Sequence, residues 1–385
     1  MNNIPVEEYI KNNIKSFKSS FDSTSSSIFN MYNYLRELLF DNLALLVILY
    51  IVLLNYVYKK DGSYYWALLI IPGLLLGNYV IKTAYRFFTP LGSKGRSKDC
   101  LEKPREIIFN RTIQPIETKQ SLLNKPFNEF LISTSHNTYV PCNQNADISS
   151  LDAIQAVLNM GARVIELDCY ANNSGGKTDD DMIPIVSHGI EKSTGDILTT
   201  TKLLFEDCID IIVQYGLLTS DPLVVCLELN TNSLIPTQKK MKEIIIKKLG
   251  DKILDPSYKL NSPNRKYYTN EPMKALLNKV IFISGGGYTN ELTGIIDGVF
   301  GESILGNDEN SADPANIKMN TPGRMGRIYP AGNLQGHLSL NFDPTPYWAN
   351  RYQMVALNFQ GNDVNMMKNV NMFKKNSFIH FSELS

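Results

Sequence analysis

Side chains capable of acid–base and metal chemistry stand in or just after short apolar runs in the middle of this 385-residue chain. The runs span 130–135, 164–170, 183–189 and 223–229. Together they present two imidazoles, three carboxylates and one amide: His136, Asn137, Glu166, Asp168, His188 and Glu228. Because strand side chains alternate between faces, Glu166 and Asp168, two residues apart, are expected to project from the same face.

The four oxygen-bearing side chains, Asn137, Glu166, Asp168 and Glu228, favour a hard cation. Ca²⁺ takes about six to eight oxygen ligands, and water and substrate can complete such a set. No His or Cys need be recruited, so the pattern does not favour Zn²⁺. Two histidines on neighbouring strands add groups that exchange protons near neutral pH. A divalent cation beside two histidines suits acid–base chemistry on a phosphodiester.

Helix signals alternate with these apolar runs. A helix is predicted over 149–161, from serine caps to a glycine stop, and a second over 199–216, from threonines to a glycine. Residues 279–287 predict a fifth strand and 353–359 the last one. Strand–helix–strand spacing implies parallel pairing, and polar residues at the carboxyl ends of the strands are typical of an α/β fold of the TIM (β/α)8-barrel type.

These motifs, in this order, resemble the catalytic barrel of the eukaryotic phosphoinositide-specific phospholipases C. The first half of that barrel is matched by SHNTY (135–139), ELDC (166–169), HG (188–189) and LE (227–228). The second half is matched by RIYPAG (327–332) and VALNFQ (355–360). The resemblance extends from about residue 120 to the end of the chain.

The resemblance implies a hydrolase of lipid degradation and signal transduction. Such an enzyme is a phosphoric diester hydrolase that cleaves phosphatidylinositol or its phosphates to diacylglycerol and inositol phosphate through a cyclic phosphodiester. The family's calcium ligands match the four oxygen donors named above. His136 would stabilise the transition state and His188 would protonate the leaving diacylglycerol oxygen, whereas the sequence does not decide whether Glu166 or Glu228 is the base. Arg327 and Tyr329 match the family's inositol-binding pair.

Two positions depart from the family pattern. Members that prefer polyphosphorylated inositides hold the ring phosphates with two lysines, where this sequence has Ile283 and Gly285. The sequence therefore leaves the choice between phosphatidylinositol and its bisphosphate open. An alternative function is a catalytically weak or inactive inositide-binding membrane protein, which the presence of both His136 and His188 disfavours. A calcium-independent lipase of bacterial type is disfavoured by the three carboxylates.

Overall composition excludes some classes of protein. The 38 basic and 38 acidic residues cancel, so charge gives no argument for a nucleic-acid partner. Five cysteines without CxxC spacing predict a reduced catalytic part rather than a disulfide framework or a zinc site. The sequence identifies no protein partner and no oligomeric state.

Residues 39–86 have the composition of a membrane segment. Two apolar runs, 43–58 and 64–81, are joined by KKDGS, and each approaches the roughly 20 residues that span a bilayer. They predict a two-helix transmembrane hairpin, with buried helices of a soluble domain or a re-entrant hairpin as alternatives. Lysines and arginines flank both ends of the hairpin, so the positive-inside rule places the catalytic part in the cytosol, at the membrane.

These observations predict six segments. They are a polar, flexible segment (1–38), the membrane hairpin (39–86), a linker (87–120), the first barrel half (121–250), a short linker between the halves (251–272) and the second barrel half (273–385).

Overall fold

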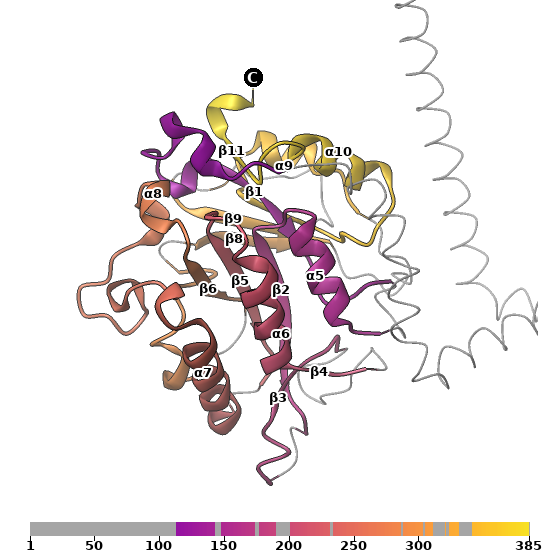
Figure 1. The fold of residues 1–385 in the computed structure, drawn as a ribbon, viewed down its shortest axis with the longest axis vertical. Coiled ribbons are helices and arrows are strands. Elements are labelled where there is room, and N and C mark those ends of the chain that lie inside the picture. Colours follow the sequence, from indigo (N-terminus) through magenta and orange to yellow (C-terminus); the bar gives the residue numbers. More distant parts are fainter. Residues whose placement is uncertain are drawn as a thin grey trace, which may run out of the picture. The chain divides into compact units, whose positions relative to one another are not determined.

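The structure is a computed structural model, and all of its described residues fall within Thr89–Ser385 (Figure 1). The described residues are 113–142, 148–173, 177–189, 201–231, 234–285, 288–302, 305–310, 320, 323–330 and 341–384. The predicted segments 1–38 and 39–86, and the 87–120 linker up to residue 112, lie outside them. Within the described ranges, no helix is long and apolar enough to cross a membrane.

Parallel strands follow one another around a sheet in the order in which they occur in the chain. They are β1 (Phe130–Ser135), β2 (Val164–Ala171), β5 (Leu223–Leu229), β6 (Val280–Ser284), β7 (Gly298–Val299), β8 (Leu305–Asn310), β9 (Met325–Tyr329) and β10 (Met354–Leu357). The sheet order is β7-β6-β5-β2-β1-β10-β9-β8, and each of these neighbouring pairs is parallel. An isolated parallel bridge between Phe300 and Leu305 links the two ends of this order. The described strands therefore form a TIM-like barrel, as predicted.

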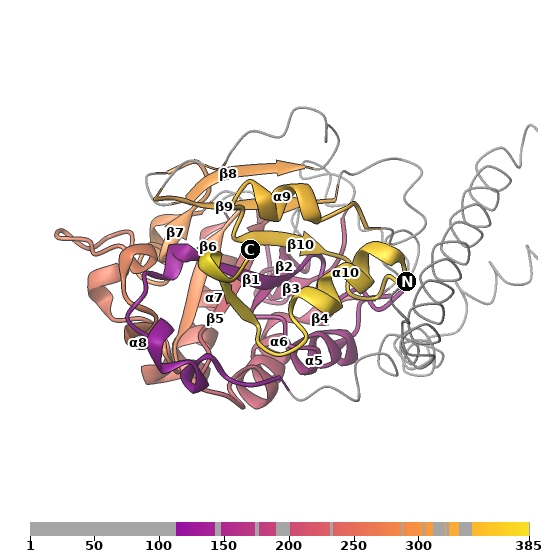
Figure 2. The ribbon, with the colours of Figure 1, turned by 90° about the horizontal axis from the view of Figure 1, so that it is seen from above.

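Helices pack outside the strands. They are α5 (Leu151–Asn159), α6 (Phe205–Ile211), α7 (Ile235–Leu249), α8 (Met273–Leu276), α9 (Thr345–Ala349) and α10 (Val364–Met372). Helices α5, α6 and α7 lie beside the β2–β5 side of the barrel in Figure 1, and Figure 2 shows α9 and α10 beside β10. The caps of the first predicted helix are confirmed, because the Ser150 side chain accepts from Asp152 N and Gly161 has φ 88°.

The second predicted helix is correct at its end and wrong at its start. Strand β4 (Leu203–Leu204) precedes α6, which therefore begins at Phe205 rather than in the threonine run at 199–201. A π-helical turn, Ile212–Gly216, completes the helix at the predicted glycine.

The run at 183–189 is not a barrel strand. It contains β3 (Pro184–Val186), which pairs antiparallel with β2 and with β4. No helix lies among the described residues between β2 and β3, and a parallel return would need a crossover of about a dozen residues or more. Strand β6 is consequently the fourth parallel strand rather than the fifth, and β7 and β8 supply the next two. Strand β11 (Phe378–His380) pairs antiparallel with β1.

Side-chain alternation separates two cores. Ile165, Leu167, Val225 and Leu227 belong to the large cluster shared with α5, α6 and α7. The alternate positions face a second cluster inside the barrel, whose members include Ile132, Val164, Val224, Cys226, Ile281, Ile283, Met325 and Met354. Continuing the alternation from Val164, Val224 and Met325 leads to Glu166, Glu228 and Arg327 further along the same inner face. The barrel interior is therefore apolar toward the amino ends of these strands and polar toward their carboxyl ends.

The segment predicted as the inter-half linker, 251–272, contains short 3-10 turns, at Pro256–Tyr258 and Tyr268–Asn270 among others. Lys259 ties it to the barrel, because its buried Nζ donates to Asp297 Oδ1 over 2.8 Å. Among the cysteines, Cys169, Cys208 and Cys226 are buried free thiols. Cys142 is disulfide-bonded, so the predicted reduced state is wrong for this residue.

Candidate active site

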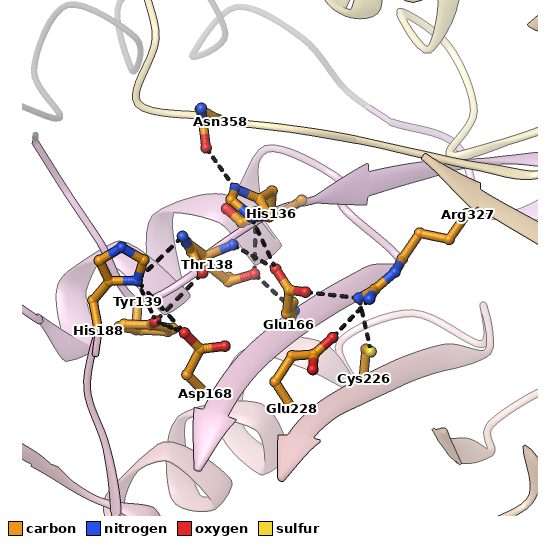
Figure 3. Close-up of polar contacts among 12 residues, drawn as sticks. His136, Thr138, Tyr139, Glu166, Asp168, His188, Cys226, Glu228, Arg327 and Asn358 are labelled. Carbon is orange, nitrogen blue, oxygen red and sulfur yellow. Dashed lines mark hydrogen bonds and ion pairs between the residues drawn. The ribbon is translucent and has the colours of Figure 1, made fainter. Parts of the chain in front are cut away.

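The polar inner layer of the barrel gathers side chains from β1, β2, β5 and β9 at the carboxyl ends of these strands (Figure 3). Strands β2 and β5 pair so that Asp168 lies opposite Glu228 and Glu166 lies opposite Cys226. This register brings three carboxylates onto neighbouring strands of the same inner face.

Arg327 forms the centre of the first group of contacts. Its Nη1 donates to Glu166 Oε1 and its Nη2 donates to Glu228 Oε1, each over 2.7 Å. The side chains of Arg327 and Glu166 are only 4% and 6% exposed. Nη1 also lies 3.1 Å from Cys226 Sγ. One buried guanidinium therefore bridges two carboxylates and offsets part of their negative charge away from water.

Asn137 begins the turn that follows β1 and has a positive φ of 42°. Asparagine tolerates this left-handed conformation better than most residues. The Asn137 backbone N–H donates to Glu166 Oε2 over 2.9 Å, so both oxygens of Glu166 accept hydrogen bonds. A strained backbone at a strand end that orients a carboxylate is typical of functional sites.

His136 is held by a neighbour that the sequence did not identify. Its Nδ1 lies 2.9 Å from Asn358 Oδ1, an oxygen that can only accept, so Nδ1 carries a hydrogen. The other ring nitrogen, Nε2, faces Glu166 Oε2 at 3.8 Å. The Tyr329 ring lies nearly parallel to the His136 ring, with an angle of 12° between planes and 6.3 Å between centroids. The ring orientation of His136 is therefore fixed, with Nε2 on the side of the carboxylates.

His188 belongs to the second group of contacts, which is organised by Tyr139. The Tyr139 hydroxyl donates to Asp168 Oδ2 over 2.8 Å and lies 3.4 Å from His188 Nδ1. His188 Nδ1 also lies 3.5 Å from Asp168 Oδ2 and 3.4 Å from Asn137 Nδ2. Burial, and then the charge of Asp168, raise the pKa of Tyr139 well above its ordinary value, so this hydroxyl keeps its proton.

Burial also affects Glu228. It raises the pKa of this carboxyl group to about 6, although the positive charge of Arg327 opposes the shift and the negative charge of Glu166 adds to it. Glu228 therefore holds a proton at a higher pH than an exposed carboxyl group does.

All eight residues predicted from the sequence lie in this region: His136, Asn137, Glu166, Asp168, His188, Glu228, Arg327 and Tyr329. The prediction missed Tyr139, Cys226, Phe300 and Asn358, which contact them. Tyr139 and Asn358 stand in the SHNTY and VALNFQ motifs, so motif membership was an available signal for both. Phe300, whose ring centroid lies 4.6 Å from Arg327 Cζ, lies outside the motifs named in the sequence analysis.

The donor set can accommodate a cation. Ligand atoms of Glu166, Cys226 and Glu228 lie within 4.8 Å of one another, and the guanidinium of Arg327 already contacts all three. Asp168 and Asn137 come from the neighbouring strand ends, and their side-chain oxygens accept from the Tyr139 hydroxyl, over 2.8 and 3.3 Å. Carboxylate and amide oxygens are the ligands that Ca²⁺ prefers, whereas the Cys226 thiol is too soft a donor for it.

Comparison with known protein families identifies the barrel. Residues 123–284 match the phosphatidylinositol-specific phospholipase C X domain, and residues 303–379 match the Y domain of the same family. This chain belongs to the phosphatidylinositol-specific phospholipase C family. The two matched ranges contain all eight predicted site residues.

Individual members of the phospholipase C family are similar to this chain over only part of their length. The 1-phosphatidylinositol 4,5-bisphosphate phosphodiesterase 1 of Saccharomyces cerevisiae is 24% identical and covers 77% of this chain, which spans 40% of that relative. The delta-3-A enzyme of Danio rerio is 28% identical, over 62% of this chain and 36% of the relative. The crystal structure of L. pealei PLC21 has the same fold, with a TM-score of 0.54 and 20% identity over 67% of this chain and 37% of the other.

The two departures from the family's lysine pattern face the interior of the barrel. Ile283 is fully buried in the inner cluster. Gly285 lies against Glu228, because a Cβ atom added to this glycine would collide with the Glu228 carboxylate. A lysine at 285 could enter only if Glu228 moved, so the position that Glu228 occupies depends on the glycine.

Proposed function

We propose that this chain is a calcium-dependent phosphoinositide phospholipase C, cleaving phosphatidylinositol or its phosphates to diacylglycerol and an inositol phosphate. The observation that carries the proposal is the convergence of His136 and His188 on three carboxylates at one end of the barrel. Two imidazoles beside a cation-binding set supply the acid, the base and the charge stabilisation that cleavage of a phosphodiester requires.

Calcium would be held by Asn137, Glu166, Asp168 and Glu228. When bound, it would make the inositol 2-hydroxyl more acidic and offset negative charge on the phosphoryl oxygens. The support for this part is the donor chemistry of the site, where oxygen atoms of Glu166 and Glu228 already surround a positive group.

The protein's own groups move the protons. Glu166 or Glu228 accepts the proton of the 2-hydroxyl, whose oxygen attacks the phosphorus to close a cyclic phosphodiester. In its protonated form His136 donates Nδ1–H to Asn358 and presents Nε2–H to the phosphoryl oxygens as negative charge grows on them. His188 gives a proton to the departing diacylglycerol oxygen and then accepts one from the water that opens the cyclic product.

Arg327 and Tyr329 would bind the inositol ring. Arg327 Cζ lies 5.2 Å from the centroid of the Tyr329 ring, and that ring is nearly parallel to the His136 ring. A phenol face suits the apolar face of inositol, and a guanidinium suits its hydroxyl groups or a phosphate.

The reaction can be tested by its products. Purified full-length protein is incubated with phosphatidylinositol in mixed micelles containing calcium, and the phosphate products are followed by phosphorus NMR. We expect a cyclic inositol phosphate to appear before the open monophosphate. Phosphatidic acid or an open monophosphate as the first product would contradict the cyclic route.

Substrate preference gives a further prediction. Since Ile283 and Gly285 offer no positive charge to ring phosphates, we expect turnover of phosphatidylinositol to be at least as fast as that of its 4,5-bisphosphate. The measurement compares kcat/KM for the two lipids in micelles of equal charge, because surface charge alone would bias binding. A preference for the bisphosphate by about tenfold or more, equivalent to about 1.4 kcal/mol, would show that other basic groups bind the ring phosphates.

The apolar pair of runs in 39–86 would anchor the enzyme in a membrane with the barrel on the cytosolic side. Such an anchor would keep the barrel close to its lipid substrate without recruitment. We expect the full chain to stay in membranes washed with alkali, and a chain lacking residues 39–86 to be released. Retention of the deletion protein after the wash would contradict the hairpin.

A further inference from the structure

Arg327 occupies the place between two carboxylates that a metal ion would take. One guanidinium nitrogen contacts Glu166 and the other contacts Glu228, each over 2.7 Å, so the group joins the two side chains rather than pairing with one of them. Candidate ligand atoms of the same two glutamates lie within 4.8 Å of each other. The two carboxylates thus share one organic cation.

Burial favours a cation at this position. The side chains of Arg327, Glu166 and Glu228 are 4%, 6% and 17% exposed. Two carboxylates so close together and so little hydrated would repel each other unless a positive charge or a proton lay between them. The Phe300 and Tyr329 rings flank the guanidinium at 4.6 and 5.2 Å, which favours its present position.

A metal ion and the Arg327 guanidinium compete for the carboxylate oxygens of Glu166 and Glu228. Each glutamate uses its Oε1 for Arg327, and Glu166 Oε2 is also engaged by the Asn137 backbone N–H. If a divalent ion bound to both glutamates while Arg327 kept its position, the two positive charges of ion and guanidinium would lie a few ångströms apart among buried side chains. We therefore expect a metal ion that binds between the two glutamates to break at least one of the Arg327 ion pairs.

We infer that Arg327 is the built-in counter-cation of the metal site, and that calcium binds by displacing it from Glu166 and Glu228. This inference rests on the proposed function for the identity of the metal. When calcium binds, the displaced guanidinium becomes able to contact the inositol ring or a phosphate of the substrate. Arg327 therefore stabilises the metal-free protein, and in the calcium-bound protein it is a positively charged substrate contact.

The test measures calcium binding without any lipid substrate. Isothermal titration calorimetry of calcium into the purified full chain in detergent compares wild type with Arg327→Gln, Arg327→Lys and Arg324→Gln. Arg324 is exposed, lies three residues away and undergoes the same loss of charge as Arg327→Gln, so it is the matched control. We expect Arg327→Gln to bind calcium on the order of tenfold more tightly than wild type, and Arg324→Gln to bind as wild type does.

The lysine variant separates displacement from repulsion at a distance. Lysine keeps the charge but cannot place two nitrogens on two carboxylates in the fixed geometry of a guanidinium. Displacement therefore predicts that Arg327→Lys binds calcium more tightly than wild type, whereas repulsion alone predicts wild-type affinity. Wild-type or weaker affinity of Arg327→Lys would therefore overturn the inference, and so would wild-type or weaker affinity of Arg327→Gln.

Thermal unfolding supplies a second readout that does not depend on activity. In chelator, Arg327→Gln should melt at a lower temperature than wild type, and calcium should raise its melting temperature by more than it raises that of wild type. Equal melting temperatures of the two proteins in chelator would also overturn the inference. Absence of calcium binding in wild type and every variant would overturn it as well. Failure of the proposed function would appear separately, as absence of lipid cleavage by a wild-type protein that binds calcium.

Discussion

Replacement of His136 or His188 by alanine is expected to lower kcat for phosphatidylinositol cleavage by a factor on the order of 10²–10⁴. The His136 variant lacks the imidazole that, when protonated, offers Nε2–H on the carboxylate side of the site while Asn358 accepts from Nδ1–H. His188 would lose the proton donor for the diacylglycerol oxygen. Because the two act on the same transition state, the double variant should lose less than the product of the two single losses.

A third histidine provides the control for these variants. His380, on β11, bonds to Glu129 and to Ser382, and it is not among the residues of the pocket. Its replacement by alanine should affect folding stability while kcat stays close to wild type. Circular dichroism establishes that all variants are folded, and near-normal turnover by folded His136→Ala and His188→Ala would exclude the proposed mechanism.

The second large effect is expected from Glu166→Gln. Glu166 accepts from Arg327 and from the Asn137 backbone, and it faces His136, so a neutral amide there alters the charge that these three groups contact. We expect kcat to fall by a factor on the order of 10²–10⁴, together with a higher calcium concentration for half-maximal activity. Activity is measured across a calcium titration.

Glu291→Gln is the matched control for that loss of charge. Among the described residues, the ion-pair partner of Glu291 is Lys242, at a long distance of 3.9 Å and at the surface, where an ion pair contributes about 0–1 kcal/mol. Its calcium titration should match that of wild type. An unchanged calcium titration for Glu166→Gln would remove Glu166 from the set of metal ligands.

The sequence predicted those site residues whose position follows from the alternation of side chains along a strand. Val164, Glu166 and Asp168 share one face of β2, and Glu228 lies opposite Asp168 in the paired strand, so apolar spacing and motif order were enough to group them. The barrel class followed from the same alternation of strands and helices.

Contacts between distant parts of the chain were not predictable. The run at 183–189 has the composition of a parallel strand, yet β3 pairs antiparallel with β2. The prediction failed because hydrophobic periodicity does not report the direction in which a strand pairs. Arg327 can bridge Glu166 and Glu228 because β9 contributes to the same barrel interior as β2, although Arg327 and Glu166 are 161 positions apart in the sequence. The hydrogen bond from His136 to Asn358 spans 222 positions in the same way.

The most direct test of the account is cleavage of phosphatidylinositol by the purified full chain in mixed micelles, with calcium or with excess chelator. We predict that diacylglycerol and inositol phosphates are released with calcium, and that release stops when the chelator is added. Undiminished cleavage in chelator would contradict the role of calcium. No cleavage under either condition by a folded protein would contradict the enzyme itself and favour a protein that only binds inositide lipids.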